Sequence, residues 1–149
     1  IADYFRTVVE NKATDVLPMQ AVTMGHKASA YSKKLFDENK YTEYLYFHGL
    51  SVQLAEACAE FIHSKIRKEC GFGDLEPITN KELLEQKYRG CRFSFGYPAC
   101  PQVSDSKFQL KWLQSDRIDL SIDTSDQLHP EQSTTAIVSL HSQARYFST

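Results

Sequence analysis

The chain has 149 residues, of which 42% are hydrophobic and 12% are aromatic, so it is long enough and apolar enough for one compact domain. Its 17 basic and 19 acidic residues leave a formal net charge of −2, which argues against a nucleic-acid-binding surface built on positive charge. No apolar run reaches the ~20 residues that a membrane helix needs, and no charged-then-apolar leader opens the chain. We therefore expect a soluble domain without a membrane segment.

The cysteines and histidines follow none of the spacings that bind metal. The four cysteines, Cys58, Cys70, Cys91 and Cys100, form no Cys-x-x-Cys pair, and the five histidines never recur at the spacing of a zinc clasp. Four cysteines at such distances are also too few for a disulfide scaffold. We expect reduced thiols, a cytoplasmic location and no metal site.

The first half of the chain is predicted to be extended and then helical. Residues 1–22 carry two apolar clusters separated by a turn at 11–15. Between Met24 and about Asn39, apolar residues recur at steps of four, three and four, which predicts a helix. The opening Ile1 suggests a piece of a longer polypeptide.

A second helix is predicted from about Leu50 to Arg67, capped by Gly49 or Ser51 and ended by Gly71 and Gly73. Its apolar side is expected to be the buried side and comprises Leu50, Leu54, Ala57, Cys58, Phe61 and Ile62. Its polar side is expected to face water and comprises Gln53, Glu56, Glu60, His63 and Arg67.

The second half is richer in strand patterns. Thr79 and Glu82 fit a capping box that opens a helix over about 80–88, and residues 108–113 fit another short helix. Alternating or β-branched residues predict strands at 93–97, 118–122 and 134–140. Helices followed by strands, without βαβ alternation, indicate an α+β fold with an antiparallel sheet.

Two places suggest ligand chemistry. Residues 92–101 set Arg92 beside Phe93, Phe95 and Tyr97 in a loop stiffened by two prolines. A guanidinium pairs with a carboxylate and aromatic faces attract cations, so an amino-acid-like ligand with a sulfonium charge would fit, although a proline-rich turn that closes a core fits equally well. Glu56 reads as a solvated glutamate, yet small alanines around it would let a ligand or backbone come close.

Several stretches taken in order resemble one family. They are residues 15–25, 44–50, 55–60, 88–90, 92–101 with Gly96-Tyr97-Pro98-Ala99-Cys100-Pro101, 129–134 and 144–147. Together they are similar to the C-terminal activation domain of cobalamin-dependent methionine synthase, in its cyanobacterial form, and the resemblance covers essentially the whole chain.

The resemblance implies a function. The full enzyme of this family, a methyltransferase of methionine biosynthesis, moves a methyl group from methyltetrahydrofolate to homocysteine through cobalamin, which another domain of the polypeptide holds. When the cofactor is oxidised, the activation domain binds S-adenosylmethionine and a flavodoxin-type protein donates an electron, so that methylcobalamin is restored. The implied fold is a curved antiparallel sheet flanked by helices, with no nucleic-acid or membrane partner.

The resemblance also implies a ligand site and no catalytic residue. Arg92 matches the arginine that engages the ligand's carboxylate, Ser94 offers backbone contacts, and Glu56 matches a glutamate that faces the ligand and hence the cavity of Arg92. Tyr97 and Tyr146 match aromatic contacts, and Phe147 follows without the hydroxyl of the tyrosine that also occurs there.

The family domain is longer at its N-terminus, where an aspartate holds the amino group of the ligand. Residues 1–149 are thus expected to be the C-terminal part of a single domain and to be inactive as an isolated fragment. The alternative is a shortened interaction module that no longer binds S-adenosylmethionine and instead docks onto a corrinoid protein or a reductase.

Overall fold

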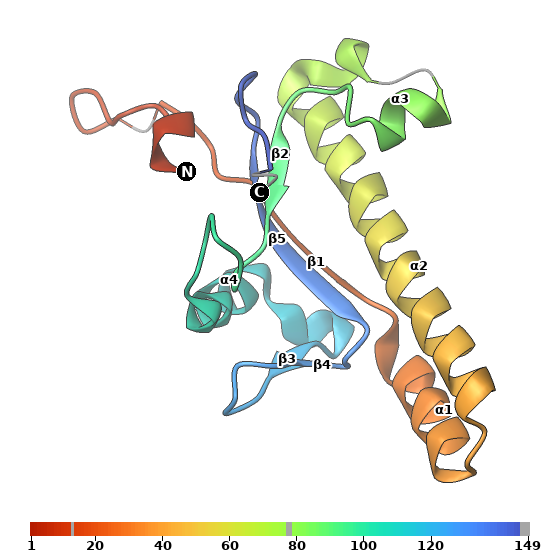
Figure 1. Ribbon diagram of the computed structural model, residues 1–149. Helices are drawn as coiled ribbons and strands as arrows, with labels where there is room; N and C mark the ends of the chain where they lie inside the picture. Colours follow the sequence, from red (N-terminus) through yellow and green to blue (C-terminus); the bar gives the residue numbers. More distant parts are fainter. Residues whose placement is uncertain (13, 77–78, 147–149) are drawn as a thin grey trace. The chain divides into compact units, whose positions relative to one another are not determined.

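The computed structural model describes residues 1–12, 14–76 and 79–146, and it contains helices and antiparallel strands (Figure 1). The chain divides into two compact units. Unit 1 comprises Ile1–Gln20, Phe61–Gln102 and Ala136–Thr149, and unit 2 comprises Ala21–Glu60 and Val103–Thr135. The α+β prediction is confirmed.

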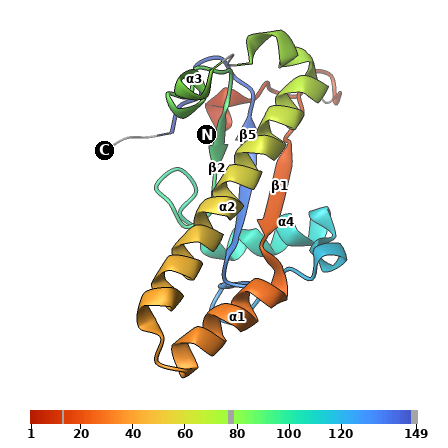
Figure 2. The same cartoon turned by 90° about the vertical axis from the view of Figure 1, so that its right-hand side faces the viewer.

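Unit 2 contains the helix α1 (Gly25–Asp37) and most of the helix α2 (Tyr41–Arg67), whose residues from Phe61 onward belong to unit 1. A short turn joins the two helices (Figure 2). The ring of Phe36 lies edge-on against the rings of Tyr41 and Tyr44, both at 5.4 Å between centroids. The predicted helix at 24–39 is thus confirmed, but α2 begins nine residues earlier than predicted. Ser51 is no cap, because it lies inside α2 and its hydroxyl donates to the carbonyl of Phe47 at 2.8 Å.

The buried face of α2 differs from the predicted one. Leu50, Leu54 and Phe61 are 57%, 46% and 59% exposed, whereas the buried residues of this helix include Ser51, Ala55, Ala59, His63 and Arg67. Alanine and serine let neighbouring backbone approach closely, which larger apolar side chains would prevent. The expectation that His63 and Arg67 face water is therefore wrong.

The rest of unit 2 consists of short elements, namely η4 (Val103–Asp105), α4 (Ser106–Leu113), η5 (Ser115–Ile118), β3 (Ser121–Ile122) and β4 (Leu128–His129). The predicted helix at 108–113 is confirmed. Of the strand predicted at 118–122, only Ser121 and Ile122 are in a strand, because Ile118 ends a 3₁₀ turn and Asp119 has a positive φ of 52°.

Gln132 links the helices of unit 2 to the chain that leads into β5. Its buried side chain accepts a hydrogen bond from the Ser29 hydroxyl at 2.6 Å, and its Nε2 lies 3.2 Å from Nδ1 of His48. The backbone N–H of Met24 donates to the Gln132 carbonyl at 3.0 Å. Gln132, which the sequence shows only as part of a polar turn at 129–134, thus bonds to both α1 and α2.

The main sheet has three strands in the order β1 (Met19–Thr23), β5 (Ser133–Ser139) and β2 (Cys91–Phe93) (Figure 1). Strand β2 runs antiparallel to β5, with Arg92 opposite Val138. The predicted strand at 134–140 is confirmed, while the one predicted at 93–97 begins at Cys91 and ends at Phe93. Gly96, in the loop that follows, has a φ of +89°.

Unit 1 also contains short helical turns at η1 (Ala2–Tyr4), η2 (Lys68–Phe72) and η3 (Gly73–Leu75), and the helix α3 (Asn80–Leu84). The capping box that opens α3 is present, since Glu82 N–H donates to the Thr79 hydroxyl at 3.2 Å and Thr79 N–H donates to the Glu82 carboxylate at 3.0 Å. The helix ends earlier than the predicted residue 88.

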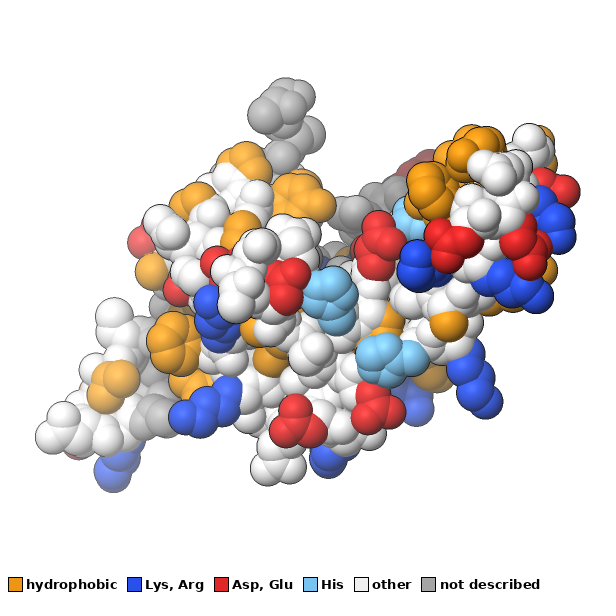
Figure 3. Space-filling view, turned by 90° about the horizontal axis from the view of Figure 1, so that it is seen from below, with side chains coloured by type: hydrophobic (Ala, Val, Ile, Leu, Met, Phe, Trp, Pro, Cys, Tyr) orange, Lys and Arg blue, Asp and Glu red, His pale blue; other side chains and the backbone are white. Residues whose placement is uncertain are grey.

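In the part of the chain that the structure describes, none of the four cysteines forms a disulfide, and Cys91 is buried with Phe93 and Ala144 in the core of unit 1. Within the described ranges, no helix is long and apolar enough to cross a membrane, and no group of three or more His, Cys, Asp or Glu residues is placed to hold a metal ion. The face drawn in Figure 3 mixes acidic and basic side chains and gathers neither sign.

Candidate functional site

The candidate site begins at β2 and the loop that follows it. Arg92 is half-buried in the strand, and Ser94 is the first residue beyond it. The loop closes on itself through two backbone hydrogen bonds, from Gly96 N–H to the Cys100 carbonyl at 2.8 Å and from Cys100 N–H to the Tyr97 carbonyl at 2.9 Å. The loop therefore has a defined shape that presents Tyr97.

Two predicted ligand contacts meet in unit 1. The rings of Tyr97 and Tyr146 lie edge to face, with centroids 6.4 Å apart and an interplanar angle of 68°. They are 54% and 42% exposed, so each ring keeps surface available for a ligand. Burial, followed by the charges of Tyr97 and Cys91, raises the pKa of Tyr146, so its hydroxyl is neutral at pH 7.

A row of rings supports this pair. Tyr146 stacks on the fully buried Phe93 at 6.4 Å, and Phe93 stacks on Tyr4 at 6.0 Å. Adjacent residues of a strand point to opposite faces of the sheet, so Arg92 leaves β2 on the face opposite Phe93. The structure thus brings Tyr97 and Tyr146 into contact beside Phe93, whereas Arg92, the middle residue of β2, points to the other face of the sheet and Ser94 follows the strand.

A buried polar cluster in unit 1 joins α2 to the segment before β2. Arg67 donates from Nη2 to the Glu76 carboxylate at 2.9 Å, and its guanidinium lies 3.9 Å from the centre of the Tyr88 ring. His63 meets the same ring edge-on at 5.3 Å and is fully buried, as Arg67 is. Among the described residues, neither ring nitrogen of His63 has a hydrogen-bond partner.

The charges of this cluster fix its protonation. Burial, together with the positive charges of Arg67 and Arg92, lowers the pKa of His63 to about 3, so the imidazole is neutral. Burial alone would raise the pKa of Glu76, but the hydrogen bonds from Arg67 and Ser64 and the charge of Arg67 outweigh it and lower that pKa. The sequence reasoning missed this cluster, although Ala55 and Ala59, in line with His63 along the helix, were the available signal.

For two of the predicted site residues, the structure does not show a place relative to this arrangement. Glu56 is exposed on the part of α2 that belongs to unit 2, whereas Arg92, Ser94, Tyr97 and Tyr146 belong to unit 1. The expectation that Glu56 faces Arg92 therefore stays a prediction. Phe147 lies outside the described residues.

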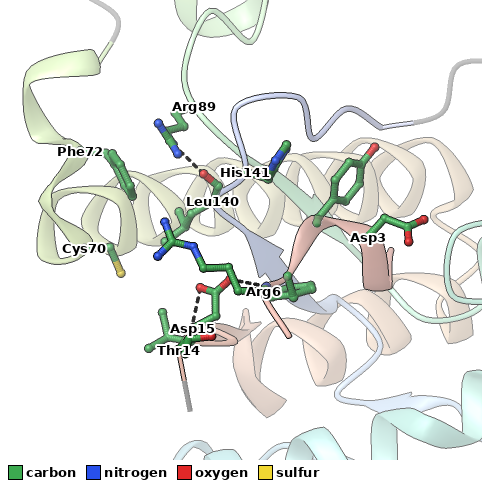
Figure 4. A pocket seen from close by; sticks show the side chains of 12 residues that line it. Asp3, Arg6, Thr14, Asp15, Cys70, Phe72, Arg89, Leu140 and His141 are labelled. Carbon is green, nitrogen blue, oxygen red and sulfur yellow. Dashed lines mark hydrogen bonds between the residues drawn. The ribbon is translucent and has the colours of Figure 1, made fainter. Parts of the chain in front are cut away.

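A cavity of about 450 Å³ lies elsewhere in unit 1 and is lined by none of the predicted site residues (Figure 4). Arg89 is one of the lining residues. Its guanidinium lies 4.3 Å from the centre of the Phe72 ring, and its Nε donates to the Leu140 carbonyl at 2.7 Å. Asp15 accepts backbone hydrogen bonds from Arg6 and Val16, which lower its pKa. Two arginines and two aspartates line this cavity, so its charge favours neither anions nor cations.

Comparison with known proteins decides the family. The family model described as "Vitamin B12 dependent methionine synthase, activation domain" matches residues 1–149. The chain belongs to this family. This activation domain is 42% identical to the methionine synthases of Mycobacterium tuberculosis and of Mycobacterium leprae over 99% of its length, and it spans 13% of the length of each.

The fold of the activation domain also matches a solved structure. A crystal structure of the MetH reactivation domain bound to AdoHcy superimposes with a TM-score of 0.82 and 26% sequence identity. The match covers 89% of this activation domain and 41% of the solved chain. The expected mixture of helices and antiparallel strands is the one that this relative has.

Proposed function

We propose that residues 1–149 are the C-terminal part of a methionine synthase activation domain and that they contribute most of a site for S-adenosylmethionine. The observation that carries this proposal is the contact between Tyr97 and Tyr146 beside the strand of Arg92, in a chain of this family. The solved relative bound to AdoHcy, which differs from S-adenosylmethionine by the methyl group and its charge, adds support.

The residues fit the chemistry of this ligand. The half-buried guanidinium of Arg92 would hold its carboxylate in a two-pronged pair, because a planar fork of donors matches two carboxylate oxygens. The half-exposed faces of Tyr97 and Tyr146 would attract the positively charged sulfonium. Ser94 would add backbone contacts, and Phe147 would add contacts from its ring or backbone.

Glu56 completes the proposed set. Its carboxylate would face the same cavity as Arg92 and offset the positive charge of the ligand. Glu56→Gln is then expected to weaken ligand binding, whereas Glu43→Gln, a neutralised exposed acid in the first turn of the same helix, is expected to leave it unchanged.

The ligand would supply its sulfonium methyl group, and the electron donor would supply the one electron that reduces the oxidised cofactor, so that methylcobalamin and AdoHcy are the products. The contribution of this chain is placement, and holding reacting groups in line can account for many orders of magnitude in rate. The proposed partners are the cobalamin-binding domain of the same polypeptide and a flavodoxin-type electron donor. The proposed location is the cytoplasm.

Calorimetric titration of the full synthase with AdoHcy tests this proposal. We expect saturable binding at one site per polypeptide, weakened by Glu56→Gln and not by Glu43→Gln. A synthase that binds no AdoHcy and no S-adenosylmethionine would contradict the proposal and favour a pure interaction module.

A further inference from the structure

The outward face of α2 carries an apolar stripe that no described part of unit 2 covers. We define the outer stripe as Tyr46, Leu50, Leu54 and Cys58, which recur every four residues on this helix. Tyr46 is 76% exposed, Leu50 and Leu54 are about half exposed, and Cys58 is exposed. At 1.5 Å per residue the stripe is roughly 18 Å long, which is the length of several helical turns.

The stripe differs from ordinary scattered apolar exposure. Single exposed apolar residues are normal on a protein surface, but a continuous ridge of Tyr, Leu and Leu marks a contact surface. A row of side chains spaced by four is the ridge that packs into the groove of a second helix. The other faces of α2 have different roles, since Ala55 and Ala59 form its buried face and Glu56 and Glu60 its acidic one.

The remaining length of the family domain indicates what covers the stripe. This chain matches 41% of the solved reactivation domain and 13% of the curated methionine synthases, so these relatives carry much chain without a counterpart here. On the proposal that residues 1–149 are the C-terminal part of an activation domain, we propose that an amphipathic helix from the remaining part of that domain packs along the outer stripe.

Cys58 makes this proposal measurable, because its thiol lies within the stripe. In the full, native synthase, alkylation of Cys58 by N-ethylmaleimide, followed by peptide mass spectrometry, is expected to be at least about tenfold slower than in the same protein unfolded in urea. Native protein in which Cys58 reacts at the unfolded rate would overturn the proposal.

A matched pair of variants tests the stripe itself. Leu54→Asp is expected to speed the alkylation of Cys58 in the native synthase, because the charge would be buried under the covering helix. Gln53→Asp places the same charge one residue away, about 100° around the helix, and is expected to leave the rate unchanged. Equal rates in the two variants would contradict the proposal. Should Leu54→Asp fail to fold, Leu54→Gln takes its place. Faster alkylation of Cys58 in Leu54→Gln than in the wild type then supports the proposal, and equal rates contradict it.

Other occupants give different results. Protection of Cys58 that disappears on dilution would indicate a second copy of the protein and overturn the proposal. Protection that disappears when the complete activation domain is separated from the rest of the synthase would indicate another domain and would also overturn it. A synthase that binds AdoHcy but leaves Cys58 reactive would refute this inference alone and leave the proposed function intact.

Discussion

Tyr97 and Tyr146 come from distant parts of the sequence, and their rings meet edge to face with centroids 6.4 Å apart. Tyr146 is fixed in turn by stacking on the buried ring of Phe93. This arrangement gives the candidate ligand site a wall of two rings that support each other.

The ring pair predicts coupled effects on binding. Tyr97→Ala and Tyr146→Ala should each weaken AdoHcy binding to the full synthase. An aromatic pair contributes about 0.5–1.5 kcal/mol beyond the free energy from its buried area. If the two single variants lose affinity by certain factors, the factor lost by the double variant should therefore be about 2- to 10-fold smaller than the product of those two factors. Tyr146→Phe, which keeps the ring, serves as control. Independent effects of the two substitutions would argue against a shared site.

Gly90 predicts a local stability effect. Its φ is +92°, and a Cβ at this position would lie 2.4 Å from the carbonyl oxygen of Ser139 in β5. Gly90→Ala should therefore add a backbone clash to a left-handed strain of about 1–3 kcal/mol. Gly71 has a φ of +86° and no atom within 4 Å of the place that a Cβ would take, so it is the matched control that carries the strain alone. Urea unfolding should show a larger loss for Gly90→Ala than for Gly71→Ala, and equal losses would contradict the close approach.

His63 predicts a dependence of stability on pH. In the unfolded chain an imidazole takes up a proton near pH 6.5, whereas burial and the charges of Arg67 and Arg92 lower the pKa of His63 to about 3 in the fold. The unfolded state binds more protons below pH 6.5, so the free energy of unfolding should fall as the pH is lowered, with this group contributing at most about 1.4 kcal/mol per pH unit.

The variant His63→Phe isolates this contribution, because it keeps an aromatic ring against Tyr88 and cannot take up a proton. Between pH 6.5 and 5, the free energy of unfolding measured in urea should fall less steeply for the variant than for the wild type. Parallel pH profiles would mean that His63 is accessible to protons in the fold.

How far the sequence predicts the fold depends on whether the deciding contacts are local. The capping box of Thr79 and Glu82 joins residues three positions apart, and the sequence indicates it correctly. The burial of Arg67 depends instead on Glu76 and Tyr88, which lie beyond the end of α2, so helical periodicity alone assigns Arg67 to the wrong face. The same periodicity assigns the face of Leu50 and Leu54 to the core, whereas the face of Ala55 and Ala59 is the buried one.

The candidate site shows the same division. Arg92 is indicated by its own segment, because an arginine among aromatic residues and prolines has a recognisable chemistry. The partnership of Tyr97 with Tyr146 and the cluster of His63 beside Tyr88 arise only when β2 pairs with β5 and the segment before β2 packs on the end of α2. Such contacts have no signature in a short window of sequence.

Binding of S-adenosylmethionine by an Arg92→Ala variant of the full synthase tests the central claim most directly. Loss of the guanidinium removes charge-assisted hydrogen bonds worth roughly 1.5–3 kcal/mol, so the affinity should fall about 10- to 150-fold, and Arg92→Lys should restore it only in part. Reactivation of oxidised enzyme should slow, while methyl transfer from methyltetrahydrofolate in primed enzyme should continue. An Arg92→Ala variant that is reactivated at the wild-type rate at limiting S-adenosylmethionine would show that Arg92 does not bind the ligand.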